Sequence, residues 1–311
     1  MVDNKQSWKA WLYLSPAIVL LLVFTAWPIV NTVLMSLLEG YNNLGAVGGQ
    51  TFNFGIGNFT YVLQYKYFLQ CLANTCLLCV ITVPISTILA LLIAVCLNAI
   101  KPLQRLLQTI FFLPYVTNSI AIGMVFAAMF TMIPGAMPGV YDSVGIINNV
   151  LGVFGIDPIN WANTGSGYWE NIAVVSVYIV WNALPFKILV LLGGLQGINK
   201  QYYDAAKVDG TSRTRTFLRI TVPLLSPMLA YVVITSFIGG FKEYSSIVGI
   251  FGADMGPSGN PRVLNTMVGF IYDALATEAQ GRASAAALIL FGIIFIVTLI
   301  NLYVSKKKTH Y

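Results

Sequence analysis

Long apolar runs recur six times along the chain, separated by shorter polar segments. Each run has about 20 or more residues, the length of helix that crosses the hydrocarbon core of a bilayer. They lie at about residues 11–38, 72–97, 106–133, 172–195, 222–241 and 283–304. The pattern predicts an all-α polytopic membrane protein whose residues 1–311 form one domain with six transmembrane helices. We expect the first run to be retained, because it is too long for a signal-peptide core and no small-residue cleavage site follows it.

Composition and charge support this class and give the chain an orientation. Only 9% of the 311 residues are charged, whereas a soluble domain has about 25%. The two termini and the connections after the second and fourth runs hold twelve of the 17 basic residues but only three acidic ones. Lysine and arginine accumulate on the cytoplasmic side, so we predict that both termini are cytoplasmic. The net charge of +6 then follows from topology and needs no nucleic-acid partner.

The connection at about residues 134–169 is predicted to lie on the outer side. Within it, residues 144–155 are predicted to form an amphipathic helix, because one helical face carries only apolar side chains. These are Ile146, Ile147, Val150, Leu151 and Phe154. We interpret it as a helix on the outer interface of the membrane, with Trp161 and Trp169 as interfacial anchors. A plain packing helix is the alternative.

Residues that commonly carry catalysis are scarce. The four cysteines, Cys71, Cys76, Cys79 and Cys96, lie in or beside the second run, without a second cysteine pair or a nearby histidine. We therefore expect buried, inert thiols and no metal site. The one histidine, His310, lies in the C-terminal tail, and the dipeptide Gly-Lys of a phosphate-binding loop is absent. The sequence predicts no catalytic residue, and no cofactor in this chain.

The cytoplasmic connection at residues 199–221 has an unusual composition for so apolar a chain. Its core, "DAAKVDGTSRTRTFLRITVP", begins at Asp204 and predicts a short helix, a turn at Gly210 and a second helical piece over residues 213–220. The two adjacent alanines suggest a small surface that a partner could approach closely. A helix–turn–helix in the cytosol is suited to docking; the alternative is a solvated loop whose arginines only satisfy the charge rule.

The spacing within this connection resembles the signature loop of bacterial ABC importer permeases. That pattern is Glu-Ala-Ala, three residues, Gly, nine residues and Ile-x-Leu-Pro. Here Asp204-Ala205-Ala206 is followed after three residues by Gly210, and after nine more by Ile220-Thr-Val-Pro223. "FFLPYV" from Phe111 and the Gly281-x-Ala-Ser-Ala entry to the last run resemble the sugar-importer, maltose-permease-like branch. The resemblance covers nearly the whole chain.

The resemblance implies a type I importer permease in the bacterial cell membrane. Its implied partners are a second, non-identical permease, a dimer of ATPase subunits that holds the ATP and Mg²⁺, and an extracytoplasmic solute-binding protein. Transport would couple ATP binding to a switch between inward and outward opening. The implied ATPase-docking residues are Asp204, Ala205, Ala206, Asp209 and Gly210. The implied cargo is a sugar or oligosaccharide; a sugar phosphate such as glycerol phosphate is the alternative, and an ion channel is the alternative from another class.

The resemblance also places the cargo path on the fourth and fifth runs. The candidates are Asn182, Phe186, Lys187, Ser236, Gly240 and Glu243. Phe186 would stack on a sugar ring, and Asn182 would bind hydroxyls. Ionised Lys187 inside a span costs about 2.5–3.5 kcal/mol on insertion scales, so it should face a cavity or a partner. Ordinary helix packing, and for Lys187 snorkelling to the cytoplasm, are the alternatives.

Overall fold

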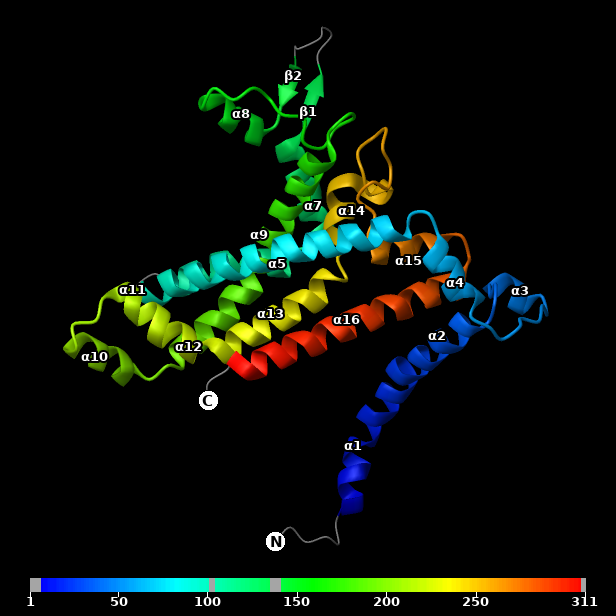
Figure 1. Ribbon diagram of the computed structural model, residues 1–311, viewed down its shortest axis with the longest axis horizontal. Helices are drawn as coiled ribbons and strands as arrows, with labels where there is room; N and C mark the ends of the chain where they lie inside the picture. The colour runs from blue at the N-terminus through cyan, green and yellow to red at the C-terminus, as the bar shows by residue number, and fades with distance from the viewer. Residues whose placement is uncertain (1–6, 101–103, 135–140, 309–311) are drawn as a thin grey trace. The chain divides into compact units, whose positions relative to one another are not determined.

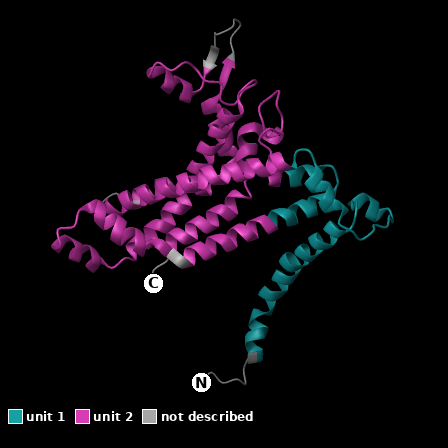
Figure 2. Cartoon of the chain, viewed as in Figure 1, with its two compact units in different colours: residues 1–68, 270–291 teal, residues 69–269, 292–311 magenta. Residues whose placement is uncertain are grey.

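The computed structural model describes residues 7–100, 104–134 and 141–308 and is built almost entirely of helices (Figure 1). Asp3, Lys5, Lys101 and His310 lie outside the described residues. The chain forms two compact units, residues 1–68 with 270–291 and residues 69–269 with 292–311 (Figure 2).

Four helical stretches among the described residues are long and apolar enough to cross a membrane. They lie over the first, second, fourth and sixth predicted runs: Trp8–Leu37, Phe68–Ala99, Tyr168–Gln196 and Gln280–Lys306. The second and fourth are the helices α5 and α9, and the sixth is most of α16 (Gln280–Lys308). Two bent pairs of shorter helices cover the third and fifth runs, so the number of spans is six if each pair counts as one.

The third and fifth runs are each interrupted by a sharp bend. In the third run, α6 (Gln104–Phe112) and a 3₁₀ turn (Leu113–Val116) meet α7 (Ser119–Phe130) at 99°. Asn118 is the N-cap residue of α7. Its side-chain oxygen accepts hydrogen bonds from the backbone N–H groups of Ile120 (2.9 Å) and Ala121 (3.3 Å). The side chain thus satisfies amides that a break inside an apolar region would otherwise leave unpaired.

The connection at residues 199–221 contains α10 (Lys200–Val208), α11 (Arg213–Thr216) and a π-helical turn (Phe217–Thr221). The fifth run contains α12 (Val222–Leu224) and α13 (Ser226–Gly240), and the helical stretch Arg213–Leu224 meets α13 at 67°. The bend falls beside Pro223 and Pro227. Each lacks a backbone N–H, and its ring excludes the regular helical approach of the carbonyl four residues earlier.

The first unit begins with α1 (Ser7–Leu21) and α2 (Trp27–Leu37), joined by a π-helical turn (Leu22–Ala26) just before Pro28. None of the most apolar 18-residue window of this stretch is buried. So much apolar surface requires lipid or another protein around it.

Buried Asn58 organises the rest of the first unit, which contains α3 (Asn43–Val47), α4 (Gly57–Gln64) and most of α15 (Met267–Ala276). Its amide donates hydrogen bonds to the carbonyls of Ser36 (3.0 Å) and Leu38 (2.7 Å) at the end of α2. Gly281 packs against Asn58 and the carbonyl of Leu38. A β-carbon added at Gly281 would lie 2.7 Å from the Asn58 amide nitrogen. Asn58 therefore connects the end of the first span to α4.

In the second unit, α7 and the short helix α14 (Ser245–Phe251) are in backbone contact. A β-carbon added at Gly123 would lie 2.6 Å from the Cα atom of Gly249, so neither helix has room for a side chain at the crossing. Fully buried side chains of Leu78, Tyr178 and Ile247 pack beside it and join α5, α9 and α14.

The segment that follows α7 holds the strands β1 (Met132–Pro134) and β2 (Tyr141–Val144), which pair antiparallel, and the helix α8 (Ile146–Val153). The helix forms where the sequence predicts it, with Ile146, Val150 and Phe154 exposed. Trp161 is partly buried, and its indole N–H donates to the side-chain oxygen of buried Asn148 (2.9 Å), whereas Trp169 is exposed. The interfacial role of α8 stays a prediction.

The crossing of α7 and α14 generates the first testable prediction. Gly123→Ala should lower the thermal stability of the purified protein, because overpacking a tight contact costs about 1–3 kcal/mol. This exceeds the roughly 0.5–1 kcal/mol that alanine contributes over glycine within a helix. Gly292→Ala on α16 is the matched control, because nothing lies within 4 Å of its added β-carbon. Equal melting temperatures for the two variants would contradict the packing described.

Candidate functional site

The connection at residues 199–221 folds as a helix closed by a left-handed turn. Asn199 accepts a hydrogen bond from the N–H of Gln201 (3.0 Å) at the start of α10. At its end, Gly210 has φ +64°, while the N–H groups of Gly210 and Thr211 donate to the carbonyls of Lys207 (3.1 Å) and Ala206 (2.9 Å). This is the Schellman arrangement that glycine favours. Nothing lies within 4 Å of a β-carbon added at Gly210, so only the backbone conformation demands glycine there.

The two alanines of α10 do not form one surface, contrary to the expectation from sequence. Ala206 is buried against the body of the protein and Ala205 is exposed. Successive helical residues point about 100° apart, so adjacent positions face different ways. Asp204, Asp209 and Gly210 are exposed, and Asp204 forms a 3.4 Å ion pair with Lys207 on the same helix. Exposed Tyr202 and Val208 extend this surface.

All six candidate cargo residues line one cavity of about 320 Å³ in the second unit. Its walls come from α5, the 3₁₀ turn after α6, α9 and the end of α13. The lining residues are Thr82, Val83, Ser86, Tyr115, Ile179, Asn182, Ala183, Phe186, Lys187, Thr235, Ser236, Gly239, Gly240 and Glu243. The volume lies within the range of small-molecule sites.

Lys187 is held inside the protein. It lies nine residues before the end of α9, and its side chain is only 4% exposed. The ammonium donates hydrogen bonds to the hydroxyls of Ser86 (2.6 Å) and Thr87 (3.3 Å) on α5. The side chain therefore does not snorkel toward the end of its helix.

Phe186 belongs to an aromatic group at the cavity wall. Its ring is stacked on Tyr115 with 6.1 Å between centroids and an interplanar angle of 19°. The ring of Tyr231 is tilted by 51° relative to that of Phe186, with 6.5 Å between their centroids. Tyr115 is brought in by the bend of the third run, so this partner depends on tertiary structure.

Gly240 is explained by close packing between α13 and α5. A β-carbon there would lie 2.7 Å from the sulfur of Cys79, so a polar side chain at this position has no room. The helix α13 ends at Gly240, so Glu243 lies beyond it, in the turn that precedes α14. It reaches the same cavity from the turn, and its carboxylate accepts from the N–H groups of Tyr244 (3.2 Å) and Ser246 (3.0 Å) at the start of α14.

The two remaining candidates, Asn182 and Ser236, already form hydrogen bonds within the protein. Asn182 donates to the hydroxyl of Ser119 (3.4 Å), which also lies 3.0 Å from the hydroxyl of Tyr178. The hydroxyl of Ser236 donates to the carbonyl of Val232 (2.5 Å). Each side chain still lines the cavity and keeps an oxygen that accepts hydrogen bonds.

Sequence reasoning missed the contribution of α5. Thr82 and Ser86 are four residues apart and share one face of an otherwise apolar helix. Polar side chains at this spacing inside a span would have indicated a face turned toward a polar neighbour. The contribution of Tyr115 carried no such signal.

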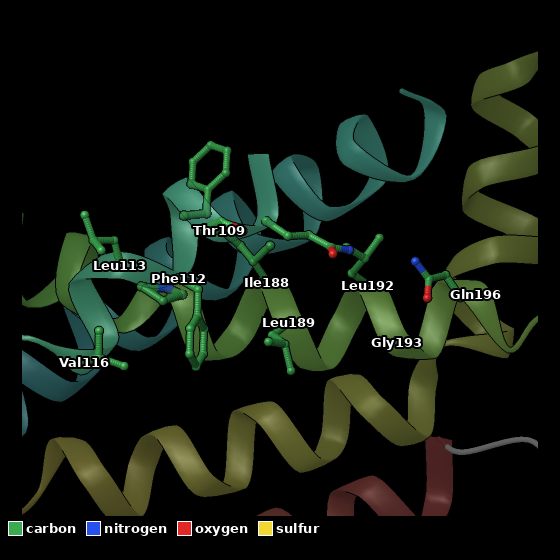
Figure 3. Close-up of a pocket in the computed structure, with 12 residues that line it drawn as sticks. Thr109, Phe112, Leu113, Val116, Ile188, Leu189, Leu192, Gly193 and Gln196 are labelled. Atoms are coloured by element: carbon green, nitrogen blue, oxygen red, sulfur yellow. The ribbon is translucent and has the colours of Figure 1, made fainter. Parts of the chain in front are cut away.

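A further cavity of about 550 Å³ lies between α6 and α9 (Figure 3). Figure 3 shows the apolar side chains of Phe112, Leu113 and Val116 facing Ile188 and Leu189 of α9. Its polar lining is neutral and consists of Gln108, Thr109 and Gln196. A space of this chemistry suits apolar groups, so it differs from the cavity around Lys187.

Comparison with known proteins places the chain in a family. Residues 83–310 match the family described as binding-protein-dependent transport system inner membrane component. The match covers most of the chain, and the protein belongs to this family. The resemblance inferred from the signature loop is thus confirmed.

Individual relatives agree over nearly their full lengths. The chain is 29% identical over 307 residues to the lactose transport system permease protein LacF of Rhizobium radiobacter, covering 96% of this chain and 95% of the relative. It is 27% identical over 304 residues to the arabinooligosaccharides transport system permease protein AraP of Halalkalibacterium halodurans, covering 97% and 89%.

A solved structure has the same fold. A chain of a bacterial ABC transporter involved in the import of the acidic polysaccharide alginate superposes with a TM-score of 0.76. The alignment covers 99% of this chain and 98% of that one at 20% sequence identity. The fold is therefore that of an ABC importer permease, as the sequence predicted.

The contact between Gly240 and Cys79 can be tested as a pair. Gly240→Ala should lower thermal stability by about 1–3 kcal/mol, because its β-carbon needs the space of the Cys79 sulfur. Cys79→Ala removes that sulfur, so the double variant should be more stable than the sum of the single effects predicts. Strictly additive melting shifts in the four proteins would contradict this contact.

Proposed function

We propose that this protein is one of two non-identical permease subunits that form the translocation pore of an ATP-driven sugar or oligosaccharide importer in a bacterial cell membrane. The observation that carries the proposal is the single cavity lined by all six candidate residues, in a chain of this family. Relatives named for lactose, arabinooligosaccharides and trehalose/maltose support a sugar as cargo.

The chemistry of the cavity suits a sugar. An aromatic face binds the apolar face of a pyranose ring, and surrounding amides and hydroxyls bind its hydroxyl groups. Here Phe186 and Tyr115 would supply the aromatic face, and Asn182 and Ser236 would bind the hydroxyl groups. The pore must also release its cargo, so a few weak contacts are better suited than a tight, fully enclosing site.

The exposed side of α10 is proposed as the docking surface for the ATPase. It would present Asp204, Ala205, Asp209 and Gly210 to the cytosol. Ala206, by contrast, is buried against the body of the protein. Tyr203 lies with its hydroxyl 3.3 Å from that of Thr221, at the start of the fifth span. Movement of a docked ATPase would therefore be passed directly to the helix that leads to the cavity. ATP and Mg²⁺ would be held by that partner, and an extracytoplasmic solute-binding protein would deliver the cargo.

The docking surface can be tested through its turn. Gly210→Ala should weaken co-purification of the ATPase subunits, because a residue with a β-carbon resists the left-handed conformation by about 1–2 kcal/mol. Gly197→Ala is the control, because Gly197 lies just before α10 and has φ −79°, which any residue adopts. Asp204→Arg should also weaken co-purification by reversing the exposed charge.

Membrane insertion of each variant should match that of the unmodified protein. If Gly210→Ala and Asp204→Arg both retained the ATPase and transport as Gly197→Ala does, this surface would not be the docking site.

The sugar site can be tested by a series at Phe186. Uptake by the complete importer should be retained in Phe186→Trp, reduced in Phe186→Leu and lowest in Phe186→Ala, because the stacking area decreases in that order. The effect should appear in the maximal rate more than in half-saturation, since the solute-binding protein captures the cargo first. Radiolabelled sugar uptake into proteoliposomes measures both.

Tyr231→Leu is the control for this series, because Tyr231 contacts Phe186 but does not line the cavity. Full uptake by Phe186→Ala would show that the ring only packs between helices.

A further inference from the structure

The ammonium of Lys187 is held only by neutral groups. The hydroxyl of Thr87 donates to the carbonyl of Val83 (2.7 Å), and that of Ser86 donates to the carbonyl of Thr82. Both hydroxyl protons are thus committed to α5, and the oxygens accept from Lys187. Among the residues that the structure describes, no carboxylate lies within 4.0 Å of this ammonium.

Glu243 does not supply the missing charge. It lines the same cavity, but its carboxylate is bound by the backbone N–H groups of Tyr244 and Ser246. These amides stabilise a negative charge at the start of α14. Lys187 has no comparable compensation. Within the described part of the chain, neither a carboxylate nor a helix terminus lies beside its ammonium group.

A neutral side chain could make the same hydrogen bonds to α5. A buried ammonium costs far more than a neutral amide unless an anion accompanies it. An ionisable side chain at membrane depth that faces a cavity is accordingly a marker of a binding path. The hydrogen bonds explain where Lys187 points, but they do not explain why this position carries a charge.

We infer that the cargo supplies the anion: Lys187 receives a carboxylate or another singly charged group of an acidic sugar while Phe186 and Tyr115 contact the ring. This inference rests on the proposed function and names its class of substrate. One lysine matches one negative charge, whereas a phosphate monoester carries nearly two. The carboxylate of Glu243, in the same wall, would repel the second negative charge of a phosphate. The site therefore favours a sugar acid over a sugar phosphate.

The test uses the complete importer, with its second permease, ATPase and solute-binding protein, in proteoliposomes that contain ATP. The outside solution holds equimolar neutral and uronic-acid-containing oligosaccharides of two to five rings. Mass spectrometry identifies what accumulates inside. We expect uronic-acid-containing compounds to exceed their neutral counterparts by about tenfold or more, the size of one charge-assisted contact.

Two substitutions separate charge from structure. Lys187→Gln keeps a donor for Ser86 and Thr87 but removes the charge, and Lys187→Arg keeps both. Accumulation of acidic oligosaccharides should fall about tenfold or more in Lys187→Gln and less than about threefold in Lys187→Arg. Only variants that purify as the intact complex are compared.

Each result has a distinct meaning. Equal accumulation of acidic compounds by Lys187→Gln and Lys187→Arg would overturn the inference and leave Lys187 as a tie between α9 and α5. Preferential accumulation of neutral sugars by the unmodified importer would also overturn it, but would leave the proposed function intact. Accumulation of no sugar at all, with ATP hydrolysis present, would overturn the proposed function itself.

Discussion

Polar groups inside a bilayer find no water, so each must be satisfied by the protein or by what it carries. The breaks in this chain depend on that constraint. Asn118 caps the helix that follows the sharp bend of the third run, and Asn58 binds the carbonyls where the first span ends. Buried Asn74 on α5 does the same for the carbonyls of Val263 and Asn265 (both 2.9 Å). Asparagine side chains therefore bind backbone groups at a break within one span, at the end of another and in a connection between spans.

The bends contribute residues to the cavity wall. The break in the third run brings Tyr115 against Phe186, and the end of α13 at Gly240 turns the chain so that Glu243 reaches the same space. Glycines make the approach possible: Gly240 lies against Cys79, and Gly123 against Gly249. The breaks in the helices thus bring polar side chains to the cavity, and the glycines beside them allow the helices to pack closely.

The connection at residues 199–221 and the cavity are linked by continuous structure within the second unit. The helix α10, the turn at Gly210 and the π-helical turn lead through α12 into α13, whose C-terminal end forms one wall of the cavity. Rigid elements in series pass on a displacement better than a loop does. On the proposed function, this arrangement would suit an importer whose energy source lies in a separate subunit, because one segment of chain would carry both the docking surface and a wall of the cargo cavity.

The sequence by itself determined the class, the approximate spans, the helix–turn–helix with its obligatory glycine and the six candidate residues. These features are encoded in local hydrophobic length, in the conformational freedom of Gly210 and in a spacing that resembles a known family. Tertiary structure decided the rest. It turned Ala206 inward and Ala205 outward, drew Trp161 into the outer segment, and paired Lys187 with Ser86 and Thr87 about 100 residues earlier in the chain. Hydropathy cannot report such contacts, because it averages over a window and contains no information about which helix faces which.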